Sequence, residues 1–195
     1  MFLQKLRNET AECHLALEKN PYSVALMSPS VTIENYLNYL TKLYGFVSGF
    51  EKNVFPSLID VDPDIENRRK THWMEQDILV LGGDLTKIPV MPAEVFSKHY
   101  THEAVALGGL YVLEGSMLGG NIIKKHLSEK LNDSVIDKMR YLTAYGAETG
   151  KVWKNFLTLL THHASDKNKE DAIIKSAVIT FRFIDEWLTS EIKLN

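Results

Sequence analysis

The placement of the prolines constrains the fold of this chain more than any other sequence feature. The six prolines form three pairs, which are Pro21 with Pro29, Pro56 with Pro63, and Pro89 with Pro92. Proline lacks a backbone N–H and its ring clashes with the preceding helical turn, so each pair marks a break between regular elements. No proline follows position 92, so long uninterrupted elements are possible in the second half of the chain.

Between these breaks the apolar residues recur at helical spacing. One stripe in the first segment consists of Leu3, Leu6, Thr10, Cys13, His14 and Leu17. The same spacing in residues 31–55 links Ile33, Tyr36, Leu37, Leu40, Leu43, Tyr44, Val47 and Phe50. Further helices are predicted over about 64–81, 93–114, 116–130, 134–160 and 168–191, with Asn132, Asp133 and Ser134 as N-cap candidates before the fourth of these. Only Ile88–Met91 resembles a strand, and prolines interrupt it. We therefore predict an all-α fold of seven or eight helices in one domain, residues 1–195.

The composition is that of an ordinary globular protein and excludes several functions. Hydrophobic residues make up 45% of the chain, charged residues 24%, and the formal charge is −3, which gives no general attraction to nucleic acid or to an anionic membrane. The chain has no apolar run long enough for a membrane span, and its first residues lack the apolar centre of a signal peptide. We therefore expect a cytoplasmic protein. Cys13 is the only cysteine, which excludes an internal disulfide and any metal site made of several cysteines.

Glycines gather in one short stretch of the second half. They are Gly108, Gly109, Gly115, Gly119 and Gly120. Each glycine inside a helix costs about 0.5–1 kcal/mol relative to alanine, so the cluster needs a compensating reason. Close packing between helices is one such reason, and the same spacing at Gly45/Gly49 and Gly146/Gly150 keeps it open. The other is a kinked helix that lies over a planar ligand, and the additional glycines at 108, 109 and 120 favour it.

His14 lies on the apolar stripe of the first segment, so we expect its imidazole to point inward. A lone inward histidine is more often a hydrogen-bonded core residue than a metal ligand. Glu18, one turn later, is placed to accept a proton from one ring nitrogen, which would leave the other free to bind a metal. Arg7, two turns earlier, could reach a carboxylate on the same ligand. A solvated carboxylate and a surface charge remain the simpler interpretations of Glu18 and Arg7.

Other catalytic and binding schemes lack their residue spacing. The chain has no Glu-x-x-His pair of the kind found in di-iron bundles. His102-Glu103 begins like a zincin helix, but Ala106 stands where the second histidine is needed. No local signature supports a Ser-His-Asp or Cys-His hydrolase. The short basic runs at 68–70 and 124–125 are more typical of solvated surfaces than of nucleic-acid contacts.

Two segments together resemble the heme oxygenase family, in its bacterial, biliverdin-producing branch. Leu6–Glu18, with sequence LRNETAECHLALE, resembles the proximal helix, and Tyr111–Gly120, with sequence YVLEGSMLGG, resembles the distal helix. The resemblance covers essentially the whole chain and implies a bundle with heme between these two helices. It implies that His14 is the proximal iron ligand and Glu18 its hydrogen-bond partner. Thr10 would line the proximal side, and Arg7 would meet a heme propionate.

The resemblance also assigns the distal side. Gly115, Gly119 and Gly120 match the glycines that let the distal helix bend across the heme face. Tyr111, on the same helix, would contact the heme. Many family members have an aspartate directly after the first of these glycines, whereas this chain has Ser116, whose hydroxyl is shorter and uncharged. Gly115, Ser116 and Gly119 are thus the implied catalytic segment. Lys154 matches a second propionate-binding residue, and Phe181 would wall the pocket.

The implied reaction is the oxidative ring opening of heme to biliverdin, carbon monoxide and ferrous iron. Heme b would be both substrate and cofactor, and O2 the co-substrate. No flavin or nucleotide fingerprint is visible, so the electrons would come from an external ferredoxin or reductase. A monomer is compatible with the sequence. The main competing hypothesis is a non-catalytic heme-binding or heme-handling protein of the same fold. Two further hypotheses are a thiamine-degrading enzyme that uses Cys13 and a purely structural helical protein.

Overall fold

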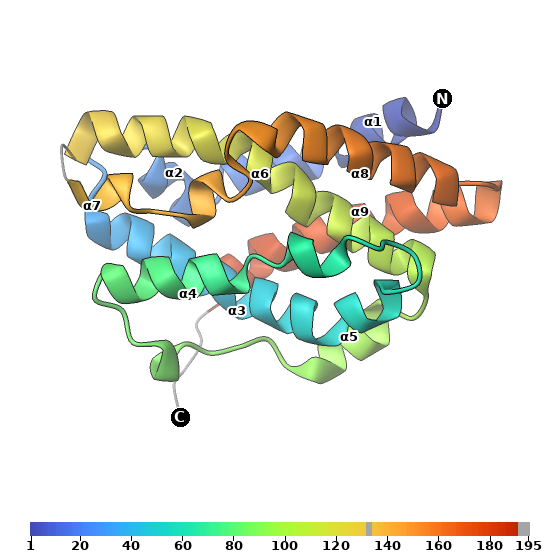
Figure 1. Cartoon of the computed structure of the whole chain (residues 1–195), viewed down its shortest axis with the longest axis horizontal. Coiled ribbons are helices and arrows are strands. Elements are labelled where there is room, and N and C mark those ends of the chain that lie inside the picture. Colours follow the sequence, from blue (N-terminus) through green and yellow to red (C-terminus); the bar gives the residue numbers. More distant parts are fainter. Residues whose placement is uncertain (132–133, 191–195) are drawn as a thin grey trace.

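The computed structural model describes residues 1–131 and 134–190, and within these ranges the chain is helical without a β-strand. The α-helices are α1 (Phe2–Glu18), α2 (Pro21–Leu26), α3 (Ile33–Asn53), α4 (Thr71–Val80), α5 (Ala93–His99), α6 (Glu103–Leu131), α7 (Ser134–Asp137), α8 (Thr149–His163) and α9 (Lys167–Thr189). Short 3-10 turns cover η1 (Phe55–Leu58), η2 (Ile65–Arg68), η3 (Leu85–Lys87), η4 (Tyr141–Thr143) and η5 (Gly146–Glu148). Figure 1 shows coiled ribbons throughout, which confirms the predicted all-α class.

Local sequence explains where several helices begin. Pro21 occupies the first turn of α2, where its missing N–H costs nothing, and the Asn20 side chain accepts the Tyr22 N–H. Thr32 and Asn35 form a reciprocal capping box at the start of α3. The Asp166 carboxylate accepts two backbone N–H groups at the start of α9. These caps satisfy donors that the first helical turn leaves without partners.

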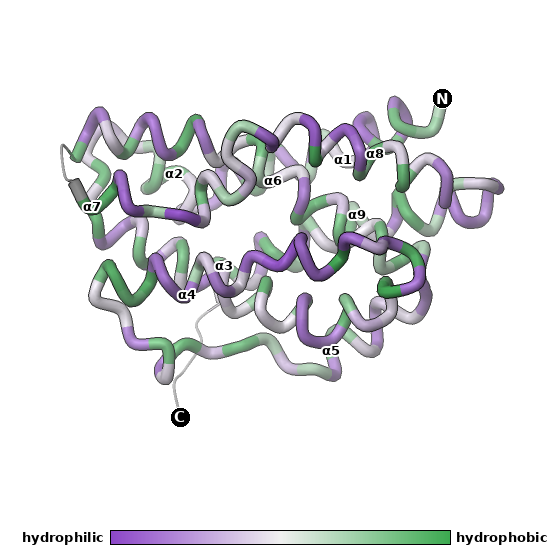
Figure 2. Tube along the Cα trace, viewed as in Figure 1, coloured by the Kyte–Doolittle hydropathy of each residue, from purple (hydrophilic) through white to green (hydrophobic). Residues whose placement is uncertain are grey.

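The longest helix, α6, forms the centre of the molecule. It packs along α9 and also contacts α8 and η4, while α9 packs on α1. In Figure 1 the two halves of α6 run in different directions. Figure 2 shows hydrophilic and hydrophobic residues alternating along the helices, as expected for helices with one buried face. The largest buried side chains of the core include Tyr36, Phe46, Phe50, Phe55, Phe96 and Phe156. Within the described ranges, no helix is long and apolar enough to cross a membrane.

The structure separates the glycines of α6 into two groups. A Cβ atom at Gly108 would overlap the Ile173 carbonyl of α9, and one at Gly120 would overlap the Leu142 carbonyl of η4. A Cβ at Gly109 would lie 2.6 Å from the Phe50 ring. These three glycines therefore permit close packing, and the prediction that they favour a ligand-facing surface is wrong. A Cβ at Gly115 or Gly119 meets no such obstacle, so close packing does not explain these two glycines.

Several predicted helix boundaries are also wrong. The break expected at residue 115 lies instead at residues 100–102, between α5 and α6. A single helical glycine costs too little to end a helix whose face is packed. The helix predicted over 134–160 is divided, and Gly146 within the division has φ of 52°, a left-handed conformation that favours glycine. The N-cap candidates Asn132 and Asp133 lie outside the described residues, as does the side chain of Ser134.

Candidate functional site

A cavity of about 380 Å³ lies between α1 and the middle of α6. Helices α3, α8 and α9 and the η4 turn complete its wall, which is largely apolar. The lining residues are Arg7, His14, Leu17, Glu18, Tyr39, Leu43, Tyr111, Val112, Leu113, Gly115, Ser116, Leu118, Tyr141, Trp153, Phe181 and Ile184. Cavities of this size, with few polar groups in an apolar wall, are typical of small-molecule sites.

His14 provides a free imidazole nitrogen on the α1 side of the cavity. Its Nδ1 lies 3.3 Å from Glu18 Oε1, one helical turn away. Its ring meets the Phe181 ring edge-on, with centroids 5.7 Å apart. The His14 side chain is 60% exposed rather than enclosed in the core, because the inward face of α1 here borders the cavity. A histidine that donates Nδ1–H to a carboxylate presents the lone pair of Nε2, and no hydrogen-bond partner of Nε2 is found among the described residues.

The other predicted residues of α1 differ in their placement. Arg7 lines the cavity and is exposed. Thr10 is buried and does not line it, and the Thr10 hydroxyl donates to the Leu6 carbonyl at 2.8 Å. Thr10 instead forms a hydrogen bond with Tyr111 of α6, which affects the pKa of that tyrosine. Burial raises the pKa of Tyr111, while hydrogen bonding to Thr10 and the positive charge of Arg7 act in the opposite direction.

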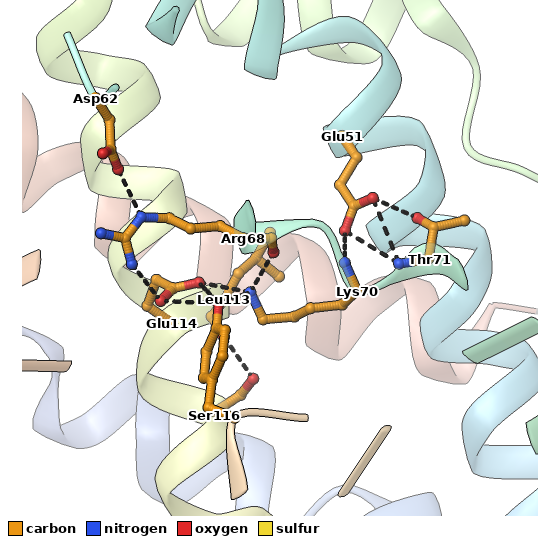
Figure 3. Close-up of polar contacts among 9 residues, drawn as sticks. Glu51, Asp62, Arg68, Lys70, Thr71, Leu113, Glu114 and Ser116 are labelled. Carbon is orange, nitrogen blue, oxygen red and sulfur yellow. Dashed lines mark hydrogen bonds and ion pairs between the residues drawn. The ribbon is translucent and has the colours of Figure 1, made fainter. Parts of the chain in front are cut away.

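On the opposite side, α6 presents backbone and a hydroxyl to the cavity. Gly115 lines it, and a Cβ at this position would lie 3.6 Å from the Trp153 ring of α8. Ser116 also lines the cavity, and its hydroxyl donates to the Leu113 carbonyl at 2.7 Å (Figure 3). Gly119 and Gly120 are not among the lining residues, and Gly120 serves the contact with η4 described above. Lys154 is exposed on α8 and does not line the cavity either.

Two tyrosines near Ser116 were not predicted from the sequence. Tyr39 of α3 and Tyr141 of η4 line the cavity. Burial raises the pKa of Tyr39 to about 12. Burial also raises the pKa of Tyr141, and hydrogen bonding to Ser116 opposes this shift. Tyr39 could have been found as the residue one turn before Leu43 on the same face of its helix, whereas Tyr141 lies in a turn that helical spacing concealed.

The cavity has the chemistry required by a flat, apolar ligand that carries a metal and acidic substituents. Trp153 and Phe181 offer aromatic walls, His14 offers one nitrogen ligand, and Arg7 offers a cation for an acidic group. Among the described residues no group of three or more His, Cys, Asp or Glu side chains gathers as a metal site. A metal bound at His14 would therefore need its remaining ligands from the ligand molecule itself.

The fold and the cavity define an all-α protein with a ligand-sized site between its first and its longest helix. The sequence model of the heme oxygenase family matches residues 1–190, and the chain belongs to this family. A heme oxygenase of Xanthomonas campestris pv. campestris strain 8004 is 25% identical over 168 residues, which cover 86% of this chain and 96% of that protein.

Solved structures of heme oxygenases share the fold. The heme oxygenase of Leptospira interrogans aligns with a TM-score of 0.81 at 15% identity, covering 96% of this chain and 98% of that chain. Heme oxygenase-1 of the cyanobacterium Synechocystis, solved in complex with heme, aligns with a TM-score of 0.76 at 16% identity, covering 96% and 90%. The NO- and CO-bound heme oxygenase of Neisseria meningitidis is 25% identical with a TM-score of 0.72, covering 96% and 90%.

Proposed function

We propose that this protein binds heme in the cavity between α1 and α6 and opens the ring to biliverdin. The observation that carries this proposal is the placement of the His14–Glu18 pair and of Gly115–Ser116 in the wall of one apolar cavity. Membership of the heme oxygenase family supports the assignment. In the reaction O2 is the oxidant and an external ferredoxin or reductase supplies electrons. The excised bridging carbon leaves as carbon monoxide, the two cut ring ends take up oxygen, and the iron is released in the ferrous state.

The residues of α1 and α9 would hold the heme. His14 Nε2 would bind the iron, and Glu18 would accept Nδ1–H and so fix the ring tautomer and its orientation. Phe181 packs edge-on against the His14 ring and limits its rotation. Arg7 would pair with a propionate and restrain the rotation of the heme in its own plane. Bound heme supplies both the iron at which O2 is reduced and the carbon bridge that is oxidised.

The residues of α6 would shape the opposite face. Gly115 brings backbone close to the cavity because it has no side chain. The apolar side chains of Val112, Leu113 and Leu118 exclude bulk water from the same wall. The Ser116 hydroxyl would turn from the Leu113 carbonyl to pass a proton from water to an acceptor in the cavity, since a hydroxyl both donates and accepts hydrogen bonds. Gly119 and Lys154, which do not line the cavity, have no direct part in this proposal.

Hemin titration tests the binding step. The wild-type protein should give the absorption spectrum of histidine-ligated heme, and His14→Ala should lose that spectrum. The matched control is His162→Ala, which removes an exposed histidine of α8 that does not line the cavity. An unchanged histidine-ligated spectrum in His14→Ala would show that the ligand assignment is wrong.

Turnover separates an oxygenase from a heme-handling protein. The feature that favours the second function is Ser116, an uncharged hydroxyl at the position where the family resemblance implies an aspartate in many members. The heme complex is supplied with O2, a ferredoxin and its reductase. A decrease of the Soret band with the appearance of bilin absorption is the expected result. A persistent Soret band without bilin would favour the non-catalytic function.

A further inference from the structure

A cluster of buried charges holds α6 immediately before the cavity-lining segment. Glu114 has a side chain that is 1% exposed. Its carboxylate accepts from Arg68 Nη1 at 2.9 Å, from Lys70 Nζ at 2.5 Å and from the Tyr145 hydroxyl at 2.9 Å. Figure 3 shows Arg68 and Lys70 reaching Glu114 from the segment that precedes α4. Two separate stretches of chain, residues 68–70 and the η4–η5 region with Tyr145, therefore converge on one carboxylate of α6.

The charges of this cluster balance one another. Arg68 also donates to Asp62, at 2.5 Å, so its guanidinium bridges two carboxylates. Burial lowers the pKa of Arg68, but the charges of Glu114 and Asp62 outweigh this effect and raise it overall. Lys70 donates a further hydrogen bond to the Arg68 carbonyl at 2.9 Å. In the described part of the chain no buried side-chain nitrogen or oxygen lacks a partner. The cluster is therefore a completed polar network, which has one low-energy geometry.

Stability alone is a weak explanation for such a network. Desolvating two cations and two carboxylates offsets most of their attraction, and apolar side chains of similar volume often stabilise a core as well or better. What a directional network adds is a fixed position for the groups that it joins. Here it joins Glu114 of α6 to Arg68 and Lys70, which lie outside the wall of the cavity.

The segment that follows Glu114 needs such an anchor. Residues 115–119 include Gly115 and Gly119. A Cβ atom added at either position would come no closer than 3.6 Å to another helix. Glycine gives the backbone more freedom than any other residue. The next packing contacts are those of Met117, whose side chain is buried in the core, and of Gly120, which packs on the Leu142 carbonyl of η4. The cavity-lining Gly115 and Ser116 therefore lie between the Glu114 network and the first of these contacts.

We propose that Glu114, held by Arg68 and Lys70, is a positioning residue that sets the place of the 115–119 backbone at the cavity. The expected consequence of this inference rests on the proposed function. In a protein that opens the heme ring, the position of this backbone decides which edge of the ring faces the oxidant. Glu114 does not touch the cavity and acts only through Gly115 and Ser116.

Two substitutions each remove one carboxylate that faces Arg68, and Glu114→Gln also removes the carboxylate that faces Lys70. Glu114→Gln breaks the link to α6, whereas Asp62→Asn leaves that link in place. Amide hydrogen exchange is followed in the protein without heme, because exchange reports local opening. We expect exchange of residues 115–119 to be about tenfold faster in Glu114→Gln, and within twofold of the wild type in Asp62→Asn. Equal acceleration in both variants, or none in either, would overturn the proposal.

A milder variant keeps the test decisive if Glu114→Gln fails to fold. Tyr145→Phe removes the hydroxyl that donates to Glu114 and accepts from Lys70, and it leaves every charge in place. We expect exchange at 115–119 to rise about threefold in Tyr145→Phe, and unchanged exchange would overturn the proposal.

The composition of bilin isomers gives the functional readout. Chromatography of the products should show one biliverdin isomer from the wild type and from Asp62→Asn, and a mixture from Glu114→Gln. A single unchanged isomer from Glu114→Gln would overturn the positioning role. Absence of any bilin from the wild type would instead overturn the proposed function, and the exchange rates would then decide the positioning role by themselves.

Discussion

The Nδ1 atom of His14 lies 3.3 Å from Oε1 of Glu18, and both side chains are 60% exposed at the wall of the cavity. An exposed pair of this kind contributes little to stability, since surface ion pairs are worth about 0–1 kcal/mol. Its effect is local, because the carboxylate fixes the tautomer of the ring and directs the lone pair of Nε2 away from the helix. This relationship is what supports the proposed ligand role of His14 over a structural one.

Replacement of Glu18 should therefore weaken heme binding without unfolding the protein. In Glu18→Gln we expect hemin affinity to fall about 10-fold, because carboxylate partners of ligating histidines typically contribute 10–100-fold. The iron–histidine stretching frequency in the resonance Raman spectrum should also decrease, since the ligand becomes less basic. Glu9→Gln, an exposed change on the same helix, is the control. Equal affinity in wild type and Glu18→Gln would exclude Glu18 from the heme site.

Alanine at two adjacent glycines of α6 should have opposite effects on stability. A Cβ at Gly119 meets nothing within 4 Å, so Gly119→Ala should raise the free energy of unfolding by about 0.5–1 kcal/mol. A Cβ at Gly120 overlaps the Leu142 carbonyl, so Gly120→Ala should lower it by about 1–3 kcal/mol, as overpacking does. Urea unfolding of both variants measures the difference. Equal effects of the two substitutions would contradict the division of the glycines into packing and open positions.

The same glycines show how far sequence predicts this protein. Helical spacing was sufficient to predict the all-α class, because apolar residues at this spacing gather on one face only when the segment is a helix. Spacing could not show that Gly108 and Gly120 are packing positions, because the carbonyls that they pack on, those of Ile173 and Leu142, come from other parts of the chain. The role of Glu114 could not be predicted for the same reason, since a lone glutamate in a helix does not show that the cations of residues 68–70 approach it.

Alkaline pH should destabilise the fold through its buried tyrosines. Burial raises the pKa of Tyr39 and of Tyr100 to about 12, above the ordinary value near 10. The folded state thus holds these protons more tightly than the unfolded chain. The stability that they contribute is complete below about pH 10 and is lost as the pH rises toward about 12. We expect the free energy of unfolding to fall by up to about 1.4 kcal/mol per pH unit for each tyrosine in this window.

Urea unfolding at pH 9 and at pH 11 measures this loss, and absorbance at 295 nm follows the phenolates directly. Tyr39→Phe separates the tyrosine contribution from that of lysines, which titrate in the same range. The variant should show a shallower decline than the wild type. Equal slopes would mean that Tyr39 ionises in the folded protein as readily as in the unfolded chain.

Removal of the Ser116 hydroxyl should slow turnover and spare heme binding. Ser116 lines the cavity opposite α1 and interacts with Tyr141, whereas the proposed iron ligand is His14 on α1. Proton transfer by a positioned side chain contributes about 10²–10⁴-fold to a rate. In Ser116→Ala a water molecule can replace part of that effect, so we expect bilin formation to slow by at least about 10-fold. Hemin affinity should remain within twofold of the wild type, as should both quantities in Ser97→Ala, which changes an exposed serine of α5. If Ser116→Ala turned over at the wild-type rate, the proton would have to reach the cavity without the Ser116 hydroxyl.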